Sequence, residues 1–93
     1  MHFVYILKCS DNSYYIGYTT DLKNRIKEHN EGSGGRNTRI KRPVQLLHAE
    51  RFENKFDALK RETQIKRWTR AKKEALIKGE NNLLHELSKR GKP

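Results

Sequence analysis

The fold is decided by a predicted hairpin in residues 3–19, which read FVYILKCSDNSYYIGYT. Residues 3–9 are almost continuously apolar and predict a central strand. Residues 13–19 predict a second strand, rich in tyrosine. The polar residues Ser10, Asp11 and Asn12 lie between them and predict the connecting turn.

The length of this turn decides which side chains share a face of the sheet. A two-residue loop pairs residue 5 with 18, which turns Tyr5 and Tyr15 to opposite faces. A three-residue loop, with a type I turn and Asn12 at the bulge position, pairs residue 5 with 17 and residue 7 with 15. Because asparagine accepts the left-handed conformation, we predict the three-residue loop, which places the two tyrosines on one face.

After the hairpin, the pattern predicts a helix, a strand and two more helices. The first helix is capped by Thr20 or Asp21 and runs to about residue 30, with apolar anchors at Leu22 and Ile26. A long loop, glycine-rich and then basic, covers residues 32–43, and loops of this kind are usually functional or disordered.

The third strand is predicted over residues 44–52, and the second helix begins at Glu53 or Asn54 and runs to residue 68. Thr69 caps a third helix, which ends at Gly79. The order β-β-α-β-α-α predicts an α+β fold, a small three-stranded antiparallel sheet flanked by helices. We expect one domain over residues 1–80, followed by a basic tail, 81–93, that forms a short helix or frays.

Glu62 occupies an unexpected position in the second predicted helix. At about 100° per residue it falls inside the apolar stripe formed by Ala58, Leu59 and Ile65. A lone ionised carboxylate turned inward is costly unless a cation, a metal or a hydrogen-bond donor faces it. Glu62 is therefore a candidate metal ligand, or else the partner of Lys66 or Arg25.

The composition favours a nucleic-acid partner. The 93 residues include 21 Lys and Arg against 11 Asp and Glu, a net charge of +10. Such a charge favours a polyanionic partner over a membrane, since no basic amphipathic segment stands out. Cys9 is the only cysteine, which excludes an intrachain disulfide. The sequence also predicts no signal peptide and no transmembrane run, so we expect a cytoplasmic protein.

The tyrosine motifs resemble those of the GIY-YIG nuclease family. Tyr5, in Val4-Tyr5-Ile6, is followed ten residues later by Tyr15, in Tyr15-Ile16-Gly17. Arg25 and His29 come next, and Glu62 lies on a later helix. The match runs from about residue 3 to residue 79, and the segment 64–77 is similar to small stand-alone bacterial members of uncharacterised function. The first motif reads Phe3-Val4-Tyr5 and carries no glycine.

This resemblance implies hydrolysis of a DNA phosphodiester with one divalent metal, Mg²⁺ or Mn²⁺, held weakly and completed by substrate. It implies that Glu62 binds the metal and that Arg25 holds the scissile phosphate. His29 contacts phosphate or passes a proton. Tyr5 is the expected general base, with its phenolate favoured by Arg25, the metal or the local positive field. Tyr15 orients the attacking water or assists.

A second set of residues is expected to follow the phosphate backbone, with binding that is non-specific and salt-dependent. The set consists of Arg36, Arg39, Lys41, Arg42, Lys66, Arg67, Arg70, Lys72 and Lys73. Trp68 either stacks on a base or packs in the core, and we favour packing.

Two functional hypotheses follow, with a weaker third. The first is a metal-dependent DNA endonuclease, structure-dependent and linked to repair or recombination. The second is a nucleic-acid-binding module without turnover, suggested by the small size and by the absence of the asparagine that some family members carry after the glutamate. The third is a protein-interaction role for Leu83, Leu84 and Leu87. We expect a monomer that binds DNA rather than RNA.

Overall fold

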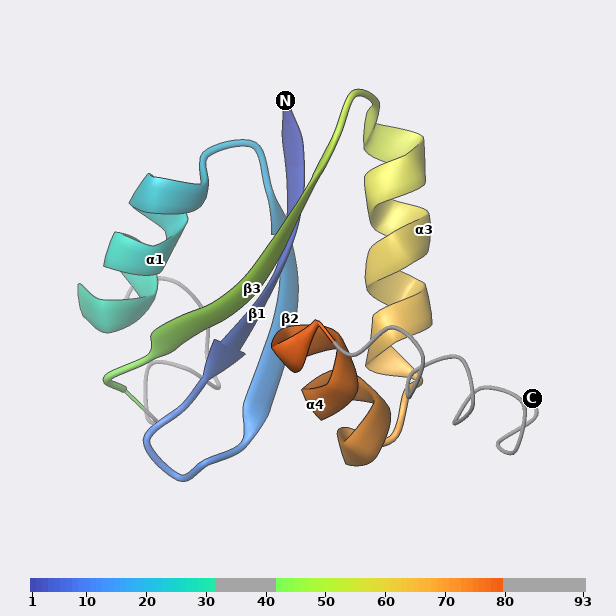
Figure 1. Ribbon diagram of the computed structural model, residues 1–93. Coiled ribbons are helices and arrows are strands. Elements are labelled where there is room, and N and C mark those ends of the chain that lie inside the picture. Colours follow the sequence, from blue (N-terminus) through green and yellow to red (C-terminus); the bar gives the residue numbers. More distant parts are fainter. Residues whose placement is uncertain (32–41, 80–93) are drawn as a thin grey trace.

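The computed structural model describes residues 1–31 and 42–79, which form one sheet with helices on both faces (Figure 1). In chain order the elements are β1 (His2–Lys8), β2 (Tyr14–Thr19), α1 (Leu22–Glu31), β3 (Gln45–Phe52), α3 (Lys55–Lys66) and α4 (Arg70–Lys78). The order β-β-α-β-α-α and the α+β class are confirmed. The predicted tail, 81–93, and most of the predicted loop, 32–43, lie outside the described residues.

The sheet is antiparallel, with strand order β2-β1-β3. The hairpin has the three-residue loop, because Tyr5 pairs with Gly17 and Leu7 with Tyr15. Backbone hydrogen bonds from Cys9 N to Ser13 O, 2.8 Å, and from Asn12 N to Cys9 O, 2.9 Å, close the loop. Asn12 has a φ of 70°, the left-handed conformation that the prediction required. The predicted register is therefore confirmed.

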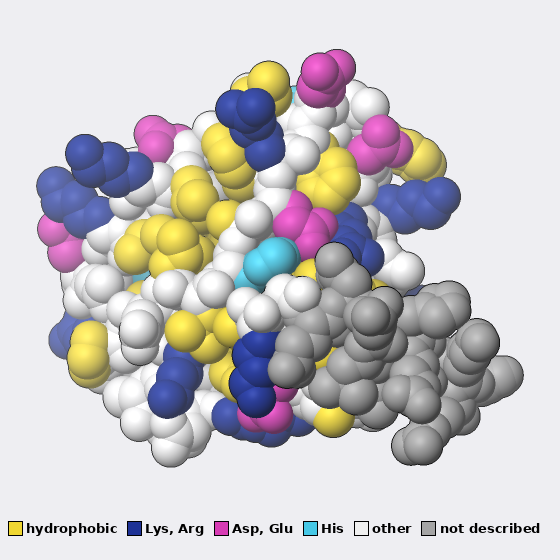
Figure 2. Space-filling model, in the orientation of Figure 1, with side chains coloured by type: hydrophobic (Ala, Val, Ile, Leu, Met, Phe, Trp, Pro, Cys, Tyr) yellow, Lys and Arg dark blue, Asp and Glu magenta, His cyan; other side chains and the backbone are white. Residues whose placement is uncertain are grey.

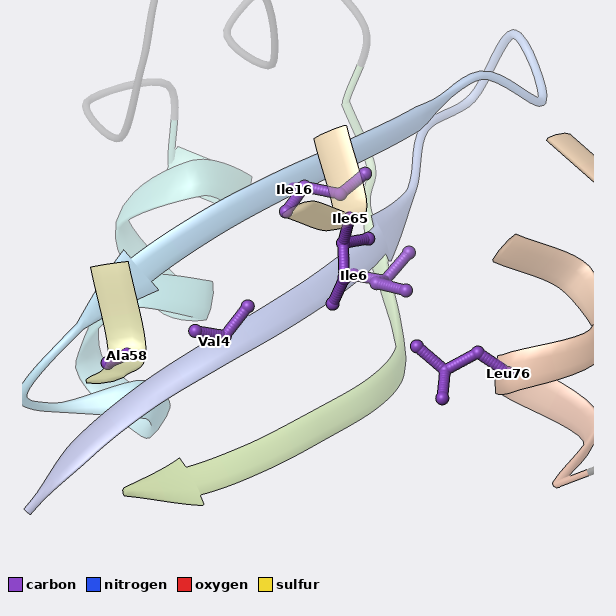
Figure 3. Packing of buried hydrophobic residues seen from close by; sticks show 6 residues of the cluster. All are labelled: Val4, Ile6, Ile16, Ala58, Ile65 and Leu76. Carbon is purple, nitrogen blue, oxygen red and sulfur yellow. The ribbon is translucent and has the colours of Figure 1, made fainter. Parts of the chain in front are cut away.

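The alternation of side chains along β1 builds a separate core on each face of the sheet. On one face, Val4 and Ile6 pack with Ile16, and α3 and α4 contribute Ala58, Ile65 and Leu76 (Figure 3). On the other face the core consists of Tyr5, Leu7, Cys9 and Val44, against which Tyr15 and the α1 residues Leu22 and Ile26 pack. The central strand is thus buried on both sides.

The helix ends decide between the predicted alternatives. Asp21 rather than Thr20 caps α1, accepting from Asn24 N at 3.2 Å. Asn54 rather than Glu53 caps α3, accepting from Asp57 N at 2.8 Å. Thr69 caps α4, and Gly79 ends that helix in the left-handed conformation with φ 76°, both as predicted.

The predicted end of the second helix at residue 68 is two residues too late. The helix α3 ends at Lys66, and Arg67 N and Trp68 N bond back to Gln64 O and Ile65 O in a tightened last turn. Trp68 then packs against the core, as we favoured. The Arg61 guanidinium and the Lys72 ammonium lie over its ring, 5.0 Å and 4.5 Å from the ring centroid.

A polar network that the sequence analysis did not identify joins β3 to α3. Arg61 donates to Glu50 from Nε at 2.8 Å and from Nη2 at 3.0 Å, and His48 Nε2 lies 2.9 Å from the same carboxylate. Burial raises the pKa of Glu50. The hydrogen bonds from His48 and Arg61, together with the Arg61 charge, lower that pKa by more, so that it falls to about 2. The folded state therefore holds Glu50 ionised.

This network predicts acid-sensitive stability. Because the pKa of Glu50 falls from 4.5 to about 2 on folding, its contribution is present above pH 4.5 and is lost as the pH falls towards 2. We expect Glu50→Gln to cost on the order of 2–3 kcal/mol at pH 7 and progressively less as the solution is acidified. Urea unfolding of both proteins from pH 7 down to pH 3 measures this. Two stability curves that stay parallel would contradict it.

Among the helices in the described ranges, none is both long and apolar enough to cross a membrane.

Candidate active site

Three predicted site residues from three different elements form an aromatic cluster on the α1 face of the sheet. Tyr5 comes from β1, Tyr15 from β2 and His29 from the last turn of α1. The Tyr5 hydroxyl and His29 Nε2 are joined by a buried hydrogen bond of 3.1 Å. The Tyr15 ring lies 6.3 Å from the Tyr5 ring and 5.1 Å from the His29 ring, measured between centroids. The predicted convergence of these side chains is therefore present.

Gly17 makes room for the cluster. It pairs with Tyr5 across the hairpin, and the Tyr5 side chain lies directly over it. A Cβ atom at position 17 would overlap the Tyr5 hydroxyl and stand 2.5 Å from Tyr5 Cζ. The absence of a side chain at residue 17 thus lets the Tyr5 ring cross β2 towards the edge of the sheet.

Gly17→Ala is therefore expected to destabilise the protein by about 1–3 kcal/mol, the usual range for overpacking a tight site. Chemical denaturation of the variant measures the loss. A double-mutant cycle with Tyr5→Leu tests the cause, because removing the ring opens the space that the new methyl group needs. An equal cost in both backgrounds would show that the Tyr5 contact is not responsible.

The protonation states of the cluster are set by burial and by the neighbouring charges. Burial, the neighbouring Tyr15 and the Glu62 carboxylate raise the pKa of Tyr5, and the Arg25 charge lowers it by less. The Arg25 charge acts in the expected direction, toward the Tyr5 phenolate, but desolvation outweighs it in this state and Tyr5 stays a neutral phenol. Burial and Arg25 lower the pKa of His29, so that its ring is neutral at pH 7. Tyr5 and His29 meet as a neutral phenol and a neutral imidazole.

Arg25 and His29 lie on neighbouring turns of α1 but differ in access to solvent. The Arg25 side chain is 38% exposed, and its Nε lies 3.4 Å from Glu28 Oε1. His29 is fully buried at 0% exposure, which favours the proton-passing role over direct contact with an external phosphate. Arg25 is exposed enough to reach a phosphate.

Glu62 extends from α3, on the other face of the sheet from the aromatic cluster. Ala58 and Ile65 beside it are fully buried, whereas the Glu62 side chain remains 17% exposed and lies 3.3 Å from Lys66 Nζ. Of the predicted partners, Lys66 therefore pairs with it. Leu59 departs from the predicted apolar stripe, because it is 37% exposed. The Glu62 carboxylate still acts on Tyr5, whose pKa it raises.

The carboxylate of Glu62 suits a weakly held Mg²⁺ ion rather than a tight metal cage. Within residues 1–31 and 42–79, no three His, Cys, Asp or Glu side chains gather closely enough to enclose a metal ion. Mg²⁺ retains several waters and commonly takes only one or two protein carboxylates, with substrate phosphate completing the shell. A single half-buried glutamate is compatible with that chemistry.

The predicted phosphate-binding residues are only partly described. Arg36, Arg39 and Lys41 lie outside the described ranges, whereas Arg42 is exposed, three residues before β3 begins at Gln45. The remaining members lie at the corner between α3 and α4: Lys66, Arg67, Arg70, Lys72 and Lys73. On the face shown in Figure 2, Lys and Arg side chains are distributed around the periphery, interspersed with acidic ones.

Several of these cations already have partners. Lys66 pairs with Glu62, Lys72 lies over Trp68, and the Arg70 guanidinium stacks on the Tyr14 ring at 4.1 Å. Arg70 Nε also donates to Glu74, which accepts a bond from the Tyr14 hydroxyl as well. Sequence reasoning did not identify this link between β2 and α4, although the Arg70 and Glu74 spacing of four residues on one helix was a signal.

The fold and the cluster agree with a family comparison. A model described as the GIY-YIG catalytic domain matches residues 1–75, so the chain belongs to the GIY-YIG family. Membership implies a nuclease-type function. More narrowly, the chain is similar to UPF0213 proteins. The UPF0213 protein of Halobacterium salinarum is 53% identical over 77 residues, which cover 83% of this chain and 100% of that protein. The UPF0213 protein of Bacillus velezensis is 55% identical over 76 residues, which cover 82% of this chain and 77% of that protein.

Solved structures of similar proteins agree with the fold. The solution NMR structure of the UPF0213 protein from Bacillus halodurans is 44% identical, with a TM-score of 0.55 and coverage of 83% of this chain and 82% of its own. An E. faecalis protein, also solved by NMR, is 41% identical, with a TM-score of 0.59 and coverage of 86% and 85%. The predicted resemblance is confirmed.

Proposed function

We propose that this protein is a metal-dependent endonuclease that hydrolyses DNA phosphodiester bonds. The observation that carries the proposal is the buried Tyr5–His29 hydrogen bond, with Tyr15 against both rings and the charges of Arg25 and Glu62 acting on Tyr5. Core packing alone would be met by apolar side chains at these positions. A buried phenol and imidazole facing each other provide a path for a proton.

The resting protonation states suggest how Tyr5 acts as a general base without a standing phenolate. The Tyr5 hydroxyl donates its proton to His29 Nε2 and accepts the proton of the attacking water, so the phenol is neutral before and after the transfer. The lowered pKa of His29 keeps its ring neutral and able to accept. Tyr15, in contact with both rings, orients the water. The rate is therefore expected to fall as the pH drops through the lowered pKa of His29.

The two charged residues act on the phosphate. Arg25 places its planar guanidinium against the non-bridging oxygens, which its partial exposure permits. Glu62, which is paired with Lys66 in this structure, would hold Mg²⁺ or Mn²⁺ in place of that pair. When bound, the metal supplies positive charge opposite the charge that develops on the phosphate and the leaving oxygen. The Tyr5 hydroxyl lies over Gly17 of the edge strand β2. We propose that Tyr5, Arg25 and Glu62 meet the substrate at this edge.

The proposal extends to the substrate and the setting. The net charge of +10 and the cationic α3–α4 corner favour a nucleic-acid partner, and membership of the GIY-YIG family favours DNA over RNA. A structure-dependent role in DNA repair or recombination is the setting we propose.

One observation favours a second candidate, a nucleic-acid-binding module without turnover. Lys66 occupies the Glu62 carboxylate, and the acidic residue of α4, Glu74, is bound to Tyr14 and Arg70. In the described residues, Glu62 belongs to no group of three or more His, Cys, Asp or Glu side chains that could hold a metal ion. This candidate predicts salt-sensitive binding of DNA or RNA that is unchanged by Glu62→Gln or Tyr5→Phe.

The test is a cleavage panel with linear, nicked and branched DNA of equal length, and an RNA duplex, in Mg²⁺, Mn²⁺ or EDTA. The endonuclease proposal expects metal-dependent strand scission of DNA. Binding of every substrate without scission in either metal would replace it with the binding module. Absence of both binding and scission would overturn both candidates.

A further inference from the structure

The helix α3 carries an exposed apolar ridge beside the candidate metal ligand. Glu62, Leu59 and Phe56 are spaced by three residues, so they are neighbours along one row of the helix surface. Their exposure rises along this row from 17% for the Glu62 side chain through 37% for Leu59 to 74% for Phe56. We call Phe56 and Leu59 the α3 ridge.

A single exposed apolar residue is common in soluble proteins and indicates nothing by itself. The ridge differs because it contains an aromatic ring and continues directly from a residue of the candidate site. Of the large apolar residues in the described ranges, Phe56 is the most exposed. Packing in the core therefore does not explain why a phenylalanine occupies this position. An exposed phenylalanine provides a flat π-face on which a base can stack.

Lysines flank the helix row that consists of the α3 ridge and Glu62. Lys55 precedes Phe56, and Lys66 lies one turn beyond Glu62, which it contacts. At about 1.5 Å per residue the two lysines are about 16 Å apart along the axis. That distance corresponds to about four or five stacked nucleotides at about 3.4 Å each. An apolar centre between two ammonium groups matches a strand whose bases face the helix and whose phosphates face the lysines.

We infer that the α3 ridge is a stacking platform for an unpaired base close to the scissile phosphate, so that the preferred substrates contain a single-stranded segment. This inference rests on the proposed function, because it takes Glu62 to mark the cleavage point. Base–aromatic stacking is independent of sequence, since every base has a π-face. The ridge thus selects strand structure rather than sequence, as duplex DNA hides its base faces.

The test is binding in EDTA, where cleavage does not interfere. Wild-type protein, Phe56→Ala and Phe56→Trp are titrated against a fluorescent duplex and against the same duplex with a short single-stranded gap containing 2-aminopurine. We expect Phe56→Ala to weaken binding of gapped DNA about five-fold or more and to leave duplex binding unchanged. Phe56→Trp is expected to preserve the preference and to quench the 2-aminopurine. The slope of affinity against salt should stay the same, because no charge is removed.

Leu46→Ala is the matched control, since Leu46 is an exposed apolar residue at 38% exposure on β3, away from α3. It should leave both affinities unchanged. Equal weakening of both DNAs by Phe56→Ala, or no weakening of either, would overturn the inference. Sedimentation that shows Phe56→Ala breaking a wild-type dimer would also overturn it, by making the ridge a contact between copies. If the wild-type protein binds neither DNA, the proposed function itself fails instead.

Discussion

Glu62→Gln will lower the rate of metal-dependent DNA cleavage by about 10³-fold or more while the protein stays folded. The substitution keeps the shape of the side chain but removes the charge that would hold the metal. If that positive charge stabilises the transition state by about 4 kcal/mol or more, its loss corresponds to this factor. Stability should change little, because the Glu62 side chain remains partly exposed and its ion pair with Lys66 reaches solvent through the exposed Lys66 side chain.

Two controls make this result specific. Glu53→Gln removes a carboxylate at an exposed position before α3 and should leave the rate unchanged. A Mg²⁺ titration followed by NMR should move the amide signals around Glu62 in the wild-type protein but not in Glu62→Gln, which reports on the metal without any turnover. Cleavage that survives Glu62→Gln would exclude Glu62 as the ligand of a catalytic metal.

Tyr5→Phe is expected to reduce cleavage by about 10² to 10⁴-fold, the range usual for loss of a general base. The ring stays in place over Gly17, so the core is preserved and only the bond to His29 is lost. The cost in stability should be about 1 kcal/mol. Single-turnover rates on DNA and denaturant unfolding measure the two effects separately.

The chain supplies a matched control for this variant. Tyr18 is also a strand tyrosine, and its hydroxyl lies 2.8 Å from His2 Nδ1, with the two rings stacked, on the α3 face of the same sheet. Tyr18→Phe therefore removes the same kind of tyrosine–histidine bond away from the candidate site. It should affect stability about as much and leave cleavage intact. If both variants slow cleavage alike, loss of stability rather than of a proton acceptor is the cause.

The hairpin shows what one sequence can determine. Its register followed from counting residues between two strands and from the one residue able to adopt the left-handed conformation. That register places Tyr5 and Tyr15 together, and the α1 spacing brings His29 to them. Local chemistry sufficed here because strand pairing and helix periodicity fix relative positions within a few residues.

The Glu50 network shows where this reasoning fails. Neither His48 nor Arg61 has a local pattern that identifies Glu50 as its partner, since the contact depends on how α3 lies against β3. The resting protonation state of Tyr5 could not be derived from the sequence, for a related reason. Counting nearby cations gives the sign of the Coulomb effect, whereas the desolvation that outweighs it depends on complete burial, and that emerges only from packing.

The Tyr5 ring, 1% exposed, belongs to the core on the α1 face as well as to the candidate site. A descendant that abandoned chemistry would still need a bulky aromatic group there to remain folded. Persistence of the ring in a relative therefore says little about whether that relative is an enzyme. The informative atom is the phenolic oxygen, because the core does not need its volume. A natural phenylalanine at position 5 would mark a relative that has kept the fold and lost turnover.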